Sequence, residues 1–172
     1  LGSQQTATYT IKNDDALVSI AASATKATET GTTGTFTISR STLDTSAELM
    51  VNLGIDSSST VTSNDGSAFG VDYSLTGGNI SGTGATRSVI IPVGMSSVDI
   101  SLTAIDDTHA EADELLKLNL AAGGYIIDTT KNNATVTIAA NDTEVINTND
   151  SSNDYTKREG SLRQALINAN AF

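Results

Sequence analysis

Short runs of alternating apolar and polar residues recur along this chain, and their period of two matches the spacing of side chains on one face of a β-strand. Clusters of Gly, Asn and Ser separate the runs, and no helical periodicity competes with them between residues 17 and 139. The pattern predicts an all-β fold, an antiparallel β-sandwich of about seven strands. We expect these strands at residues 17–28, with a break near Ser23, and at 34–40, 47–55, 87–92, 98–104, 114–120 and 134–139.

One strand pattern occurs twice. Residues 7–11 read ATYTI and residues 134–138 read ATVTI, and each run is followed within four residues by an Asp. Repetition at the spacing of a whole domain is typical of tandem modules. We therefore expect residues 1–15 to be the last strand of a preceding repeat, residues 16–142 to form one complete sandwich, and residues 143–172 to be a linker and the start of a following domain.

Acidic residues are concentrated between the predicted strands at 98–104 and 114–120. Five carboxylates lie within nine residues there, those of Asp106, Asp107, Glu111, Asp113 and Glu114. Carboxylates this close repel one another at neutral pH, and a hard divalent cation such as Ca²⁺, which takes six to eight oxygen ligands, relieves the repulsion. A solvated acidic turn is the alternative interpretation.

Strand parity predicts where the other acids lie. If consecutive strands alternate in direction, the connections after the first, third, fifth and seventh strands meet at one end of the sandwich. The acids on these connections are Glu29, Asp56, Asp65, Asp72, Asp106, Asp107, Glu111, Asp113 and Asp142. The acids expected at the opposite end are Asp44 and Asp128, with Arg40 and Lys131 close by in sequence. The asymmetry favours a cation site at the first end.

Several separate motifs in this order resemble the Calx-beta domain over about residues 17–142. They are TETG at 28–31 before TFTI at 35–38, NDGSA at 64–68, GVDY at 70–73, IDD at 105–107, EADE at 111–114, and the run at 134–138 that closes on Asp142. The resemblance implies an immunoglobulin-like sandwich, used in tandem in surface or secreted proteins, with Ca²⁺ bound by loops at one tip. It implies the ligands Glu29, Asp72, Asp106, Asp107, Glu111 and Asp142.

The tail after Thr143 differs in composition and predicts a short helix. Ser161 is suited to cap it, with Gln164 three residues later completing a capping box. An apolar stripe follows at Leu162, Ala165, Leu166 and Ala169, and so short a helix should fray unless it docks. The segment resembles the entry to parallel β-helix domains of bacterial surface proteins.

Composition excludes several classes of function. A formal net charge of −11 makes nucleic acid and anionic lipid poor partners, and no apolar run approaches the roughly 20 residues of a membrane span. Catalysis is not expected, because His109 is the single histidine, cysteine is absent and no nucleophile motif occurs. Tyrosines are scattered one per segment, which argues against a carbohydrate-stacking face.

The sequence therefore predicts a Ca²⁺-binding structural or adhesive module, not an enzyme, in a multidomain protein at the cell surface or secreted from it. The ion would stiffen the loop tip and the joint to the next module. The expected partners are neighbouring modules of the same chain and a cell-surface or matrix ligand. The alternatives that stay open are a metal-free spacer module with the same fold and a carbohydrate-binding sandwich.

Overall fold

The structure is a computed structural model, and it describes residues 15–41, 45–61, 72–106, 110, 112–142 and 161–170. Within these residues it contains ten strands and one helix. They are β1 (Leu17–Ala24), β2 (Lys26–Thr28), β3 (Gly34–Ser41), β4 (Leu49–Ile55), β5 (Tyr73–Thr76), β6 (Thr86–Ile91), β7 (Ser97–Ala104), β8 (Glu114–Leu120), β9 (Ile126–Ile127), β10 (Asn133–Ala139) and α1 (Leu162–Ala169).

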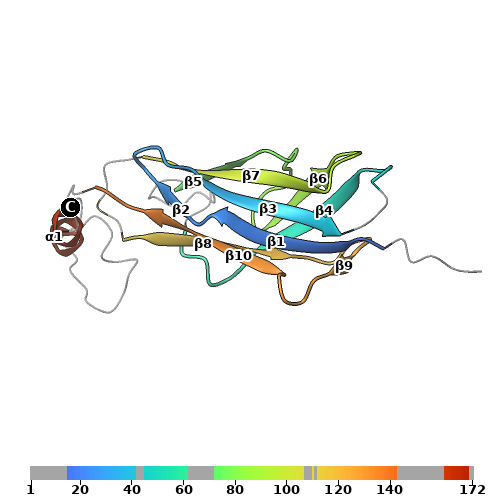
Figure 1. The fold of residues 1–172 in the computed structure, drawn as a ribbon. Coiled ribbons are helices and arrows are strands. Elements are labelled where there is room, and N and C mark those ends of the chain that lie inside the picture. The colour runs from blue at the N-terminus through green and yellow to red at the C-terminus, as the bar shows by residue number, and fades with distance from the viewer. Residues whose placement is uncertain are drawn as a thin grey trace, which may run out of the picture.

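The strands form two five-stranded sheets that pack face to face, so the predicted sandwich is confirmed (Figure 1). One sheet has the order β5-β7-β3-β1-β9 and the other the order β2-β10-β8-β4-β6. The inner pairs are antiparallel, whereas β1 with β9 and β2 with β10 are parallel. Strand alternation does not distinguish these pairings, because it reports only which side chains share a face.

The expected strand at 17–28 divides between the two sheets. β1 pairs with β3 in one sheet, and its register shifts between Ala22 and Ala24. After Thr25 the chain continues as β2, which pairs with β10 in the other sheet, and the Thr137 amide donates to the Thr25 carbonyl at 2.9 Å. A β-bulge bends a strand in this way, and the break follows the predicted position by two residues.

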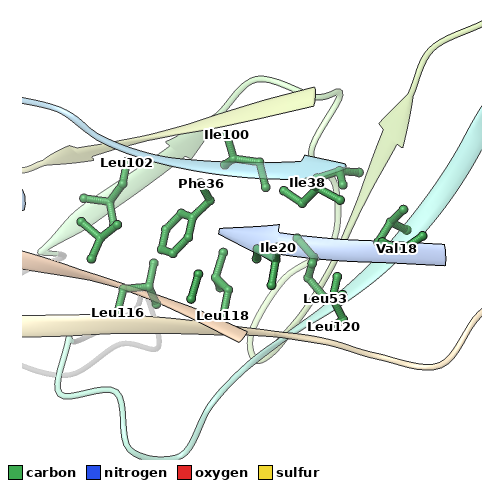
Figure 2. Packing of buried hydrophobic residues seen from close by; sticks show 14 of the residues in the cluster. Val18, Ile20, Phe36, Ile38, Leu53, Ile100, Leu102, Leu116, Leu118 and Leu120 are labelled. Carbon is green, nitrogen blue, oxygen red and sulfur yellow. The ribbon is translucent and has the colours of Figure 1, made fainter. Parts of the chain in front are cut away.

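Side chains that alternate along each strand fill the space between the sheets (Figure 2). Phe36 and Ile38 of β3, and Leu116 and Leu118 of β8, point into this space, and all four are fully buried. The alternation read from the sequence therefore identifies the core face correctly. The sheets approach closely at Gly34, where an added Cβ would lie 2.4 Å from a Val136 methyl group.

Two strands were not predicted. β5 lies in the long connection between the expected strands at 47–55 and 87–92, and it pairs with β7. β9 contains two residues and extends the sheet beside β1. Both are too short to produce a clear alternation of their own.

Helix α1 begins as the sequence predicts, and the Ser161 hydroxyl accepts a hydrogen bond from the Gln164 amide at 3.2 Å. The face that it buries is different from the apolar stripe. Of that stripe only Ala165 is buried, while Leu162 and Leu166 are exposed. Within the described residues no helix is both long and apolar enough to cross a membrane.

Candidate metal centre

Three carboxylates from distant parts of the chain meet at one end of the sandwich. Glu29 follows β2, Asp106 lies two residues after β7, and Asp142 lies three residues after β10. One carboxylate oxygen from each residue lies within 4.8 Å of the other two. We call these three residues the carboxylate cluster. Glu29 and Asp142 are partly buried, and Asp106 is exposed.

Glu29 is placed by a tight turn that ends β2. The Thr28 amide donates to the Thr32 carbonyl at 2.9 Å, and the Gly31 amide donates back to the Thr28 carbonyl at 3.0 Å. Gly31 has a φ of 114°, a left-handed conformation that costs a residue with a side chain more than it costs glycine. The Thr28 hydroxyl also accepts from the Thr32 amide at 3.0 Å, so the sequence around Gly31 fixes the turn.

The loop after β10 reaches Glu29 directly. The Asn141 amide donates to the Glu29 Oε2 at 3.2 Å, which holds the residue before Asp142 against that carboxylate. Among the described residues, the buried side-chain Oδ1 of Asn141 has no hydrogen-bond partner. A buried acceptor of this kind is uncommon in folded proteins, and it belongs to the residue next to Asp142.

The other three predicted ligands, Asp72, Asp107 and Glu111, are not part of the carboxylate cluster among the described residues. Asp72 is 8% exposed. Its main-chain carbonyl accepts a hydrogen bond from the amide of Ile105, the residue before Asp106, at 2.9 Å. Its carboxylate is not one of the three that gather within 4.8 Å among the described residues. Asp107 and Glu111 lie outside the described residues.

The parity argument holds only in part for the long connection between β4 and β6. β4 is antiparallel to β8 and so runs toward the acidic end, but Gly54 pairs with Asn119 near the far end of β8. β6 begins opposite Gly54, so neither strand reaches the acidic end there. β5 is antiparallel to β7 and so starts where β7 finishes, at the acidic end. This is why residue 72 lies close to residue 105.

Asp56 was expected at the acidic end, but it lies beside the second half of β8 and does not join the cluster. Its carboxylate accepts from the Asn119 side chain at 2.7 Å and from the Ser58 amide at 2.9 Å, and Lys117 lies 3.5 Å away. These hydrogen bonds, the one from Asn119 foremost, hold the pKa of Asp56 below its ordinary value. Asp56 therefore ties the end of β4 to β8.

Asp128, which was expected at the opposite end, is likewise occupied by its own turn. Its carboxylate accepts from the Thr130 hydroxyl at 2.7 Å and from the Thr130 amide at 2.9 Å, and these hydrogen bonds lower its pKa. Such a turn is a common local use of Asp. Asp44 and Asp65 lie outside the described residues.

The oxygen set of the cluster fits a hard divalent cation. Calcium–oxygen distances of about 2.3–2.6 Å allow two ligands of one ion to lie at most about 5 Å apart, and the three carboxylates satisfy this limit. Mg²⁺ demands shorter distances and a stricter octahedron. Three carboxylates from separate loops therefore match the chemistry of Ca²⁺ better than that of softer metals.

Comparison with known proteins gives similarities to solved structures alone. No protein-family model matches the chain, and no curated protein sequence matches it. The calcium binding domain CBD12 of CALX1.1 is 18% identical with a TM-score of 0.47, over 75% of this chain and 49% of that one. This chain thus spans about half the length of that structure.

Two further structures are similar over most of this chain. The apo-form Calx CBD1 domain is 18% identical, with a TM-score of 0.46, over 73% of this chain and 99% of that one. AggA, the major subunit of aggregative adherence fimbriae type I from Escherichia coli, is 14% identical, with a TM-score of 0.40, over 77% and 99%. Membership of the Calx-beta family stays a prediction from the sequence motifs.

Proposed function

We propose that this chain is a Ca²⁺-binding β-sandwich module, and that the ion is held by Glu29, Asp106 and Asp142. The observation that carries the proposal is the convergence of these three carboxylates within 4.8 Å from three separate loops. The buried Asn141 Oδ1, which has no hydrogen-bond partner in the part of the chain that the structure describes, supports it, because this acceptor belongs to the residue next to Asp142 and a hard cation takes such oxygens. Asp72, Asp107 and Glu111 remain proposed additional ligands.

The proposed role of the ion is to join loops that no strand connects. Glu29 belongs to one edge of its sheet through β2, whereas Asp106 follows β7 of the other sheet, so an ion bound by both ties the two sheets together. An ion that binds the folded state alone stabilises it by about 2.7 kcal/mol at a hundredfold excess over the dissociation constant. The tip would be looser without calcium.

The wider setting is proposed on the same basis. Calcium sites of extracellular modules commonly have dissociation constants of about 10⁻⁴–10⁻³ M, which suits a partly exposed cluster of this size. We infer a module of a surface or secreted protein, in which the ion stiffens the joint to the following part of the chain. Its partners would be neighbouring modules and a cell-surface or matrix ligand, and no catalytic role is proposed.

A calcium titration tests the proposal. Calorimetry should show binding at millimolar Ca²⁺, and the melting temperature should be higher in Ca²⁺ than in EDTA. Asp106→Asn should weaken binding by about tenfold, since one fewer charge attracts the ion. In EDTA the same variant should be as stable as the original chain or more so, because it relieves repulsion within the cluster.

Asp113→Asn is the matched control. It removes the same charge from an exposed residue of the same connection, outside the cluster. Its calcium affinity should stay close to that of the original chain. Identical melting curves in Ca²⁺ and EDTA, with no heat of binding at millimolar Ca²⁺, would instead favour the metal-free spacer.

A further inference from the structure

Helix α1 buries a polar face. Ser161, Gln164 and Asn168 recur at the spacing of one helix face, and each is at most 7% exposed. Leu166 on the opposite side is 56% exposed. Apolar burial therefore does not explain the docking of this helix, and the polar contacts on its buried face must specify where it docks.

These contacts lead to the carboxylate cluster. The Gln164 Nε2 donates to the Asn168 Oδ1 at 2.7 Å, and the Asn168 Nδ2 donates to the main-chain carbonyl of Asp142 at 2.5 Å. Figure 1 shows α1 beside the end of the sandwich where β10 finishes. The helix thus holds the peptide unit of one of the three residues whose carboxylates converge.

We propose that α1 is a cap on this end of the sandwich, and that Asn168 is a positioning residue which raises the affinity of the carboxylate cluster for Ca²⁺. The inference rests on the proposed function. A hydrogen bond to the Asp142 carbonyl restricts the backbone from which the carboxylate projects, so less freedom is lost when the ion binds. Coupling of this kind is reciprocal, and bound Ca²⁺ favours the docked helix by the same factor.

The docked helix is suited to respond to the ion. The Gln164 Oε1 is buried with no hydrogen-bond partner among the described residues, and burying such an oxygen opposes docking. Leu162 and Leu166 are exposed, so of the apolar stripe only Ala165 adds buried surface to the docked state. A weakly favoured state is the kind that a ligand shifts measurably.

Asn168→Ala in the full chain tests the inference. Alanine is the stronger helix former, so the helix itself is preserved while the bond to Asp142 is removed. Calorimetry should show Ca²⁺ affinity about two- to tenfold weaker, the equivalent of one hydrogen bond. Leu166→Ala truncates an exposed side chain of the same helix and should leave the affinity unchanged.

Hydrogen exchange of the α1 amides separates positioning from a merely structural role. In the original chain, Ca²⁺ should slow the exchange of these amides, and in Asn168→Ala this response should shrink. A lower melting temperature in EDTA with unchanged calcium affinity would overturn the inference and leave the proposed function intact. If the original chain binds no Ca²⁺, both are overturned.

Discussion

At the scale of single residues, Arg40 shows how one buried charge organises the end of the sandwich opposite the carboxylate cluster. It follows Phe36 and Ile38 on the core face of β3 and is 7% exposed. Its guanidinium donates to the carbonyls of Met95, Ala47 and Pro92 at 2.9, 2.9 and 3.1 Å. The planar guanidinium with five donors suits this task, because three carbonyls from two loops converge on it.

We expect Arg40→Met to destabilise the chain by about 2–4 kcal/mol, because the buried side chain loses its three hydrogen bonds to main-chain carbonyls. Arg40→Lys should recover only part of this stability, since a single ammonium group does not reproduce the planar arrangement of guanidinium donors. Urea unfolding of both variants checks this, with Lys26→Met at an exposed position as the control, expected within about 0.5 kcal/mol of the original. Equal stability of Arg40→Met and the control would contradict the structural role.

At the scale of elements, Asp56 joins β4 to β8 and makes stability depend on pH. Its pKa in the folded chain lies below the ordinary value of 3.8, so the folded state favours the charged carboxylate more than the unfolded state does. This contribution is complete above about pH 4 and is lost as pH falls from there toward the folded-state pKa. The connection between the two strands should therefore weaken in acid.

Asp56→Asn removes this titration and keeps a side-chain acceptor for the Ser58 amide. The free energy of unfolding of the variant should be lower at pH 7 and should fall less steeply between about pH 4 and pH 2. Denaturant unfolding at several pH values measures how the free energy of unfolding of the variant and of the original chain depends on pH. If the stability of the variant fell as steeply in acid as that of the original chain, Asp56 would not be the group responsible.

Element termini also decide which polar groups reach the carboxylate cluster. The turn at Gly31 and the loop before Asp142 bring two strands of one sheet, β2 and β10, to the same point. Because β2 and β10 are parallel, both finish at this end, and the residues that follow them bring Glu29 and Asp142 together. A strictly antiparallel pair would place the two strand ends at opposite ends of the sandwich.

At the scale of the whole molecule, the two ends are held by different chemistry. Carboxylates from three loops gather at one end, whereas at the other Arg40 bonds directly to main-chain carbonyls. We expect Ca²⁺ to slow the hydrogen exchange of backbone amides in residues 28–32 and 140–142, because it suppresses local opening there. The exchange of amides in residues 92–97 should not change. Peptide-resolved exchange with and without Ca²⁺ measures this. An equal change at both ends would argue against an ion confined to the cluster.

Local patterns in the sequence predict the sandwich, its core face and the end at which Glu29, Asp106 and Asp142 lie. Each of these follows from local properties: the period of two places Phe36 and Leu116 inside, and strand parity orders the loops. The Ser161 cap was equally local and was predicted correctly. The conformation of a single strand or turn depends mainly on residues adjacent in the sequence, so it can be predicted from them.

Which partner each group finds depends on how distant segments pack. Nothing adjacent to Asp56 in the sequence reveals that the Asn119 side chain will donate to its carboxylate, and parity wrongly placed Asp56 with the acids that do converge. The polar face of α1 could have been read from its spacing, but the contact of Asn168 with Asp142 could not. Pairings between distant residues depend on how the sheets twist and join at their edges, and those are properties of the packed chain as a whole.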